Sequence, residues 1–249
     1  MSGHTLAVWI ELGLAVITAL ALLFVTAPYG RHQRGGWGST ISARAGWVIM
    51  ESPAVLWFGA VYAAGDHRGD TVPLILFAMW QWHYLQRTLI FPLRMRASGK
   101  RTPLLVVGLA IGFNLLNGYV NARWISQLGR YSVDWLSDPR FIAGAGLFAA
   151  GWWINVRADR ALFRLRGPGE SGYAIPRGGL YELVSCPNYL GETLEWCGWA
   201  LATWSFAGLA FAVYTAANLV PRALDHHRWY RDRFADYPAP RKAIIPFVL

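Results

Sequence analysis

Polar side chains recur at helical spacing in three segments of the C-terminal half of this 249-residue chain. Residues three or four positions apart lie on one face of a helix, so each segment presents a polar stripe. The stripes consist of Asn155, Asp159 and Arg166, of Asn188, Glu192 and Glu195, and of Arg222, His226 and Tyr230. Stripes that face outward only solvate a membrane interface. Stripes that face one another form a polar cavity able to hold a large, charged, hydrogen-bonding ligand.

Two more candidate residues lie in apolar segments nearer the N-terminus. Glu51 lies beside Pro53, which can kink a helix and open space next to the carboxyl group. Tyr84 follows His83 and shares a helix face with Arg87. Ionisable residues at membrane depth are costly and usually functional. The alternatives are a structural hydrogen bond to a neighbouring helix for Glu51 and an interfacial aromatic belt for Tyr84.

The composition indicates which elements position these residues. Apolar residues make up 55% of the chain and charged residues only 15%, whereas a soluble domain carries about 25% charged residues. Lipid must therefore cover much of the surface. The 23 basic residues outnumber the 14 acidic ones, but they cluster between apolar runs rather than along one patch, which argues against nucleic-acid binding. Two cysteines are too few for a disulfide framework or a structural zinc site, and we expect no metal.

These features predict an all-α, polytopic integral membrane protein with a single domain over residues 1–249. A membrane helix needs about 20 mostly apolar residues, and the sequence has about seven such runs. They are Leu6–Thr26, Trp47–Ala64, Val72–Phe91, Pro103–Val120, Phe141–Val156, and Leu190–Leu224 as two spans with a turn near Ser205–Gly208. Most basic residues fall on one side of these spans, which predicts an N-terminus outside and a C-terminus in the cytoplasm.

Several motifs resemble those of the steroid 5α-reductases, the family of 3-oxo-5α-steroid 4-dehydrogenases. The resemblance covers nearly the whole chain and is strongest from Asn155 to the end. Its motifs include Pro168-Gly169-Glu170, Gly178-Gly179-Leu180, Leu190-Gly191-Glu192, His226-His227-Arg228 and Asp236-Tyr237-Pro238.

The resemblance implies an NADPH-dependent reductase that acts on the Δ4 double bond of a 3-oxosteroid by hydride transfer to C5. Glu51 and Tyr84 match the pair that engages the ketone, where donors stabilise the developing negative charge. Residues 1–120 would bind the substrate and residues 139–249 the cofactor. The residues that match NADPH contacts are Asn155, Asp159, Arg166, Tyr173, Asn188, Glu192, Arg222, His226 and Tyr230, with Arg101 or Lys100 for the 2′-phosphate.

Beyond the steroid and the lipid bilayer, we expect no obligatory protein partner. Arginine far outnumbers lysine among the basic residues, and alanine and glycine are abundant, which favours a bacterial source. The location would then be the bacterial inner membrane, or the endoplasmic reticulum of a eukaryote.

Two other functions stay open. Pro187, Tyr189 and Gly191 also resemble isoprenylcysteine-type membrane methyltransferases, which use S-adenosylmethionine, although Asp225-His226-His227 stands where that family has paired glutamates. A non-enzymatic lipid-binding or scaffold protein would explain the spans but not the stripes.

Overall fold

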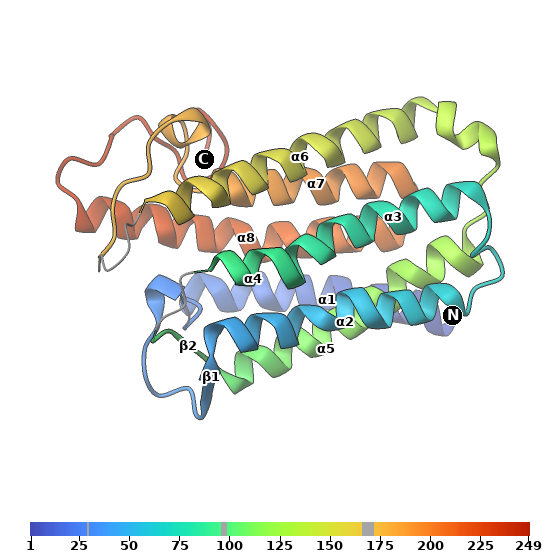
Figure 1. Ribbon diagram of the computed structural model, residues 1–249, viewed down its shortest axis with the longest axis horizontal. Helices are drawn as coiled ribbons and strands as arrows, with labels where there is room; N and C mark the ends of the chain where they lie inside the picture. The colour runs from blue at the N-terminus through green and yellow to red at the C-terminus, as the bar shows by residue number, and fades with distance from the viewer. Residues whose placement is uncertain (29, 96–98, 166–171) are drawn as a thin grey trace.

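Long helices that run along a common axis make up most of the protein (Figure 1). The computed structural model describes residues 1–28, 30–95, 99–165 and 172–249. Within these ranges the long helices are α1 Gly3–Phe24, α2 Ala43–Ala63, α3 Thr71–Leu85, α5 Leu104–Arg123, α6 Pro139–Arg164, α7 Pro187–Thr203 and α8 Phe206–Arg233. Each predicted span corresponds to one helix, except that Val72–Phe91 runs from α3 through the π-helical segment Gln86–Ile90 to the start of α4. The all-α class is confirmed except for one small sheet.

The sheet consists of β1, Thr40–Ser42, and β2, Arg101–Pro103, paired antiparallel with Ile41 opposite Thr102. Strands this short show no measurable alternation of polar and apolar residues, so the sequence pattern did not predict them. The short helices are the 3-10 segments Gly30–His32, Val133–Ser137 and Gly179–Glu182, the π-helical segments Gln86–Ile90 and Trp124–Leu128, and α4, Phe91–Arg94.

The sequence explains where several helices begin and end. The side chains of Ser2, Ser42 and Ser205 cap α1, α2 and α8 by accepting a hydrogen bond from a backbone N–H in the first turn. The predicted division between the last two helices is confirmed. It lies at Trp204, which has a left-handed backbone conformation with φ of 43°, followed by the cap Ser205.

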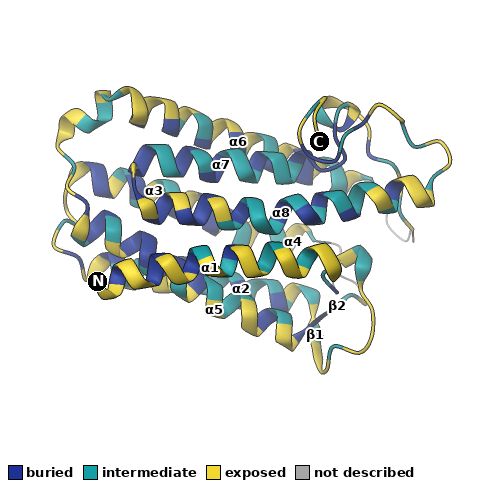
Figure 2. Ribbon diagram, turned by 180° about the vertical axis from the view of Figure 1, so that it is seen from behind, coloured by how far each residue is buried: buried dark blue, intermediate teal, exposed yellow. Residues whose placement is uncertain are grey.

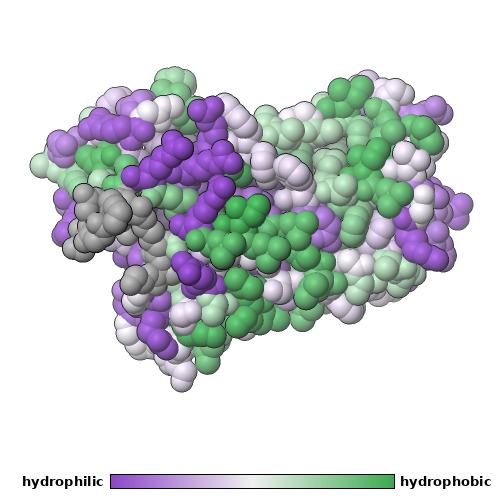
Figure 3. All heavy atoms as spheres, viewed as in Figure 1, coloured by the Kyte–Doolittle hydropathy of each residue, from purple (hydrophilic) through white to green (hydrophobic). Residues whose placement is uncertain are grey.

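The surface of the bundle is apolar over much of its length. Among the described residues, two helices, Gly3–Phe24 and Leu104–Leu128, are long and apolar enough to cross a membrane. Large apolar side chains such as Phe24 (86% exposed), Leu56 and Leu109 are exposed. Exposed residues recur along the outer helices of the bundle (Figure 2). On the face in Figure 3, hydrophobic residues gather over the middle of the bundle and hydrophilic ones toward its two ends. These features suit a membrane protein, while the seven crossings and their orientation stay predictions.

Aromatic rings form the core between α2, α3, α7 and α8. Trp80 is fully buried and stacks on Phe58, with ring centroids 4.2 Å apart. Trp196 and Trp199 of α7 approach the same ring to 5.3 Å, and Phe211 of α8 to 5.5 Å. Rigid rings with two rotatable bonds hold the four helices in fixed register.

Helices α6 and α7 pack with their backbones in direct contact. Gly144 and Gly151 of α6 face Gly198 and Gly191 of α7, and the two glycines on each helix are seven positions apart. A Cβ atom added at Gly151 would lie 2.4 Å from the nitrogen of Glu195 and 2.5 Å from the carbonyl oxygen of Gly191. Glycine is therefore required there for close packing, as in other helix pairs with small residues at the interface.

We expect Gly151→Ala to lower stability by about 1–3 kcal/mol, because the added methyl group meets backbone atoms that cannot move aside alone. The measurement is the midpoint of thermal unfolding in detergent. Gly146→Ala is the matched control, since it lies on the same helix and its added Cβ would meet nothing within 4 Å. An equal loss in both variants would contradict the packing argument.

Candidate active site

Arg87 is a buried cation at the centre of the bundle. It lies in the π-helical turn that joins α3 to α4, and its carbonyl oxygen accepts a hydrogen bond from the indole of Trp47 at 3.0 Å. Its guanidinium group lies 3.3 Å from Asp159 and 3.5 Å from Glu192. The ring of Phe91, 4.7 Å away, covers another side of the group. Because the π turn shifts the helix register, it aims the guanidinium at α6 and α7.

Two asparagines hold those carboxylates in place. The amide of Asn155 donates to the carbonyl oxygen of Asn188 at 3.0 Å and to Glu192 at 3.3 Å. The amide of Asn188 donates to Asp159 at 3.1 Å. The predicted stripes of α6 and α7 therefore face each other, and four of the residues expected to contact NADPH form one network with Arg87.

Glu51 and Tyr84 lie on α2 and α3. Tyr84 is 5% exposed, and its ring lies 5.7 Å from the ring of Trp196 on α7. Glu51 lies one turn after Trp47 on α2, and the Arg87 guanidinium lies over the Trp47 ring at 5.0 Å. Next to Tyr84 in the chain, His83 pairs with Glu195 at 2.8 Å, and both side chains are almost fully buried. The two predicted residues therefore lie on elements that border the network.

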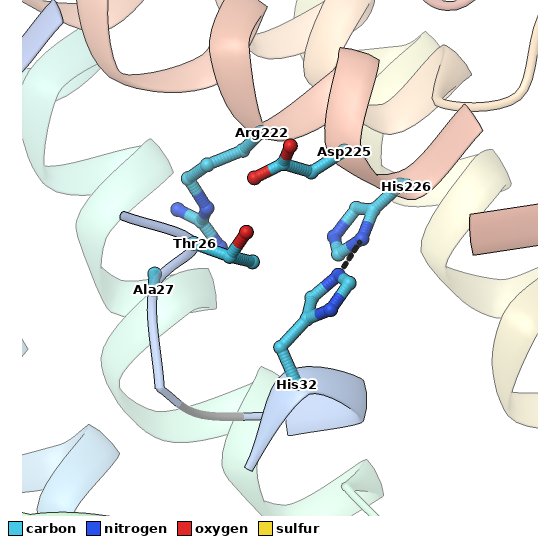
Figure 4. A pocket seen from close by; sticks show the side chains of 6 residues that line it. All are labelled: Thr26, Ala27, His32, Arg222, Asp225 and His226. Carbon is cyan, nitrogen blue, oxygen red and sulfur yellow. Dashed lines mark hydrogen bonds between the residues drawn. The ribbon is translucent and has the colours of Figure 1, made fainter. Parts of the chain in front are cut away.

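A second polar cluster lies toward the C-terminal half of α8 (Figure 4). Arg222 donates to the hydroxyl of Tyr189 at 2.9 Å, and this hydroxyl lies 3.1 Å from Nε2 of His226. Nδ1 of His226 lies 2.9 Å from Nε2 of His32. One set of tautomers satisfies the whole chain: Tyr189 donates to His226, which donates to His32. The cluster lines a small pocket with Thr26, Ala27 and Asp225.

Tyr230, the last residue of the predicted α8 stripe, binds Arg31. The guanidinium of Arg31 donates to the Tyr230 hydroxyl at 3.2 Å and lies over the rings of Tyr230, Trp229 and Tyr173, at 4.5, 5.1 and 5.7 Å. Its Nη1 atom is buried without a hydrogen-bond partner within the described residues. Lys100 approaches the Tyr173 ring from the other side, at 5.7 Å.

Two predicted cofactor-binding residues, Arg101 and Arg166, do not join either polar cluster within the described residues. Arg101 lies in β2, where its side chain binds the hydroxyl and carbonyl oxygens of Thr40 at 2.6 and 2.7 Å. This contact occupies the guanidinium, so Arg101 is less available for a phosphate than Lys100. Arg166 lies outside the described residues.

Helical periodicity did not select Arg31 and His32 as site residues and did not join Tyr189 to the stripes. Arg31 and His32 lie in a loop with no helical periodicity, and their partners are almost 200 residues away in the chain. A map of predicted residue contacts could have found them, because it would pair Arg31 and His32 of the first loop with the His226–Tyr230 segment.

Buried ion pairs and a separate basic pocket among apolar helices are costly features, which indicates a functional site. The family model for 3-oxo-5-alpha-steroid 4-dehydrogenase matches residues 100–249. The chain belongs to this family of oxidoreductases.

Individual relatives agree over almost the full length. The chain is 46% identical to a steroid 5-alpha-reductase of Gossypium hirsutum, over 94% of this chain and 93% of the relative. It is 44% identical to 3-oxo-5-alpha-steroid 4-dehydrogenase 1 of Rattus norvegicus, over 97% and 95% of the two chains. These matches favour the reductase over the methyltransferase alternative. Both relatives come from eukaryotes, so they give no support to the expected bacterial source.

The His32–His226 contact predicts a loss of stability at acidic pH. Burial, and then the positive charge of Arg31, lowers the pKa of His32 below its ordinary value, while Asp225 opposes this shift and Arg222 and Arg34 add to it. Below the ordinary pKa of about 6.5, the unfolded chain binds a proton that the folded chain does not. Stability is therefore fully present above pH about 6.5 and falls below it, by at most about 1.4 kcal/mol per pH unit for one group.

The measurement is the thermal midpoint across about pH 5 to 8, compared with His32→Asn, which should flatten the acidic part of the curve. His67→Asn is the control, because His67 pairs with Asp70 in the loop between α2 and α3. An unchanged slope in His32→Asn would rule out this histidine as the source.

Proposed function

We propose that this enzyme reduces the Δ4 double bond of 3-oxo-Δ4-steroids with NADPH and forms 5α-dihydro-3-oxosteroids. The observation that carries the proposal is the network that joins Arg87 to the carboxamides and carboxylates of α6 and α7. Glu51 and Tyr84, two hydrogen-bonding side chains from the N-terminal half, lie on elements that border this network. The relatives named above are steroid reductases by name, which supports the same substrate class.

The chemistry of the donor set fits NADPH. Arg222 lines a pocket with His32, His226 and Asp225, while Arg31 and Lys100 both lie 5.7 Å from the centroid of the Tyr173 ring. These cations suit phosphate groups. The buried, unpartnered Nη1 of Arg31 is a donor of the kind that a phosphate oxygen satisfies. Asn155, Asn188 and Glu192 offer amide and carboxylate groups suited to a carboxamide. NADPH, when bound, supplies the hydride for C5 of the enone.

The chain's own residues polarise and orient the steroid. Addition of hydride to an enone places negative charge on the C3 oxygen, so donors at that oxygen stabilise the transition state. The Tyr84 hydroxyl and a neutral Glu51 carboxyl group are the proposed donors. Arg87 holds the carboxylates of Asp159 and Glu192 in place. These ion pairs lie at the boundary between two parts of the chain. We propose that residues 1–120 bind the steroid and that residues 139–249 bind NADPH.

A turnover assay in detergent tests the proposal. Purified protein should oxidise NADPH only when a 3-oxo-Δ4-steroid is present, and the product should be the 5α-dihydro ketone by mass spectrometry and chromatography against both C5 epimers. S-adenosylmethionine should neither bind nor react. Binding of S-adenosylmethionine without NADPH binding would replace the reductase with the methyltransferase, and binding of neither would favour a non-enzymatic protein.

Tyr84→Phe and Glu51→Gln should keep NADPH affinity and lose most turnover, by about 10²–10³-fold for the loss of one oxyanion donor. Glu51→Gln retains an N–H donor and should be milder than Glu51→Ala. The measurements are kcat, NADPH affinity and thermal midpoint for each variant. A purely structural role gives the opposite pattern, with a lower midpoint and preserved turnover per folded molecule.

Asn188→Ala tests the proposed cofactor side of the site in the same experiment. It removes a donor to Asp159 and leaves a buried carboxylate less well paired, which costs roughly 1–3 kcal/mol. We expect NADPH affinity to fall more than steroid affinity. Weaker steroid binding with unchanged NADPH binding would contradict the proposed division of the chain.

A further inference from the structure

His83 of α3 and Glu195 of α7 form a polar pair inside the aromatic core. Nδ1 of His83 lies 2.8 Å from Oε1 of Glu195, and the two side chains are 3% and 0% exposed. The second carboxyl oxygen, Oε2, is buried without a hydrogen-bond partner among the described residues. A buried polar atom without a partner costs free energy, and apolar side chains of similar volume often replace such a pair without loss of stability. The pair therefore indicates a role beyond packing.

This pair lies next to a second polar contact with α7. Arg87, four residues after His83, lies 3.5 Å from Glu192, three residues before Glu195. Residues three or four positions apart share a helix face, so Glu192 and Glu195 present their carboxyl groups on the same side of α7. Tyr84 lies between His83 and Arg87 in the chain. Polar contacts with α7 on both sides of Tyr84 thus fix the position of its backbone relative to that helix.

Neighbouring rings fix the side chain of Tyr84. In the described part of the chain, no hydrogen bond joins its hydroxyl to another residue. The ring centroid of Tyr84 lies 4.9 Å from those of His83 and Trp80, and 5.7 Å from that of Trp196. The His83 ring in turn meets the Trp196 ring edge-on, at 4.6 Å. Because Trp196 follows Glu195 in the chain, the bond between His83 and Glu195 holds both of these rings beside Tyr84.

We propose that Glu195 is a positioning residue, which acts through His83 to hold the Tyr84 hydroxyl at the ketone of the substrate. Glu195 fixes the imidazole, and the imidazole and Trp196 fix the ring that carries the hydroxyl. Without the pair the phenol can shift, and a shift of about 1 Å near the reacting atoms can lower a rate by about 100-fold. This inference rests on the proposed role of Tyr84 as a donor to the ketone.

Glu195→Gln and Glu195→Leu are a matched pair of variants that tests the inference. An amide can donate or accept, so glutamine keeps a hydrogen bond to Nδ1 of His83 in either tautomer, whereas leucine keeps none. We expect kcat to fall by roughly 10- to 100-fold in Glu195→Leu and to stay within a few-fold of the native value in Glu195→Gln. The KM for steroid and the affinity for NADPH should change little in both. Equal kcat values in the two variants, native or lowered, overturn the inference.

Glu195→Leu in a Tyr84→Phe background separates failure of the inference from failure of the proposed function. In this background the substitution should cause no further loss of kcat, because the hydroxyl that Glu195 positions is gone. Equal losses in both backgrounds overturn the inference and leave the proposed function standing. If Tyr84→Phe alone keeps full turnover, the proposed role of Tyr84 is wrong, and the inference is wrong with it.

A double variant provides the second test if Glu195→Leu fails to fold. His83→Phe combined with Glu195→Leu replaces both partners by apolar groups, which can be nearly neutral for stability. It keeps a ring beside Tyr84 but removes the hydrogen bond that holds that ring to α7. We expect kcat to fall by at least about 10-fold, as for a misplaced reacting group. Native turnover in this double variant overturns the inference.

Asn121→Leu is the matched structural control. Asn121 of α5 is 1% exposed and accepts a hydrogen bond at 2.8 Å from Trp199, which lies one turn after Glu195 on α7. Its replacement also breaks a buried hydrogen bond to α7, so it should lower the thermal midpoint and leave kcat per folded molecule unchanged. If Asn121→Leu lowers kcat as much as Glu195→Leu does, the effect is loosened packing of α7, and the positioning role is overturned.

Discussion

The burial of the Arg87 guanidinium is the constraint on which the rest of the structure depends. A charge taken out of water is tolerated only when partners and hydrogen bonds surround it. Asp159 and Glu192 supply the opposite, negative charge, and the rings of Trp47 and Phe91 cover the faces of the guanidinium group. These partners come from α2, α4, α6 and α7, so the four elements must converge on one point. The site is therefore part of what fixes the packing of the bundle.

The glycine contact between α6 and α7 makes this convergence possible. Along α6, Gly144, Gly151 and Asn155 lie on one face, which Asp159 continues one turn later. The face that permits backbone contact thus becomes, without a break, the face that carries the polar network. Asn155 reaches the backbone of Asn188 because the helices are this close. Side chains larger than glycine would separate the helices and open the network to water or lipid.

The sequence predicted the helices and several residues that the structure brings into one polar network, for reasons visible in particular residues. Periodicity predicted the stripes with Asn155 and Glu192, because both partners lie on regular helices. The resemblance supplied the pairing of Glu51 with Tyr84, which spacing alone left open. The π turn at Arg87 was not predicted, because a single inserted residue does not alter the hydropathy pattern. The contacts of His32 and Arg31 were missed since they join a loop to α8 across most of the chain, where local pattern carries no information.

The distribution of charge explains how one buried site suits a ligand with two chemically different ends. Around Arg87 the carboxylates of Asp159 and Glu192 offset the cation, so that region favours neutral, hydrogen-bonding groups. Around His226 the cations of Arg31 and Arg222 gather with few acids, so that region favours phosphates. Tyr189 joins the two regions, since it lies on α7 one position from Asn188 and binds Arg222 and His226. The proposed cofactor NADPH has this same polarity, with phosphates at one end and an uncharged dihydronicotinamide at the other. The proposed binding mode would place its neutral end toward Glu51 and Tyr84.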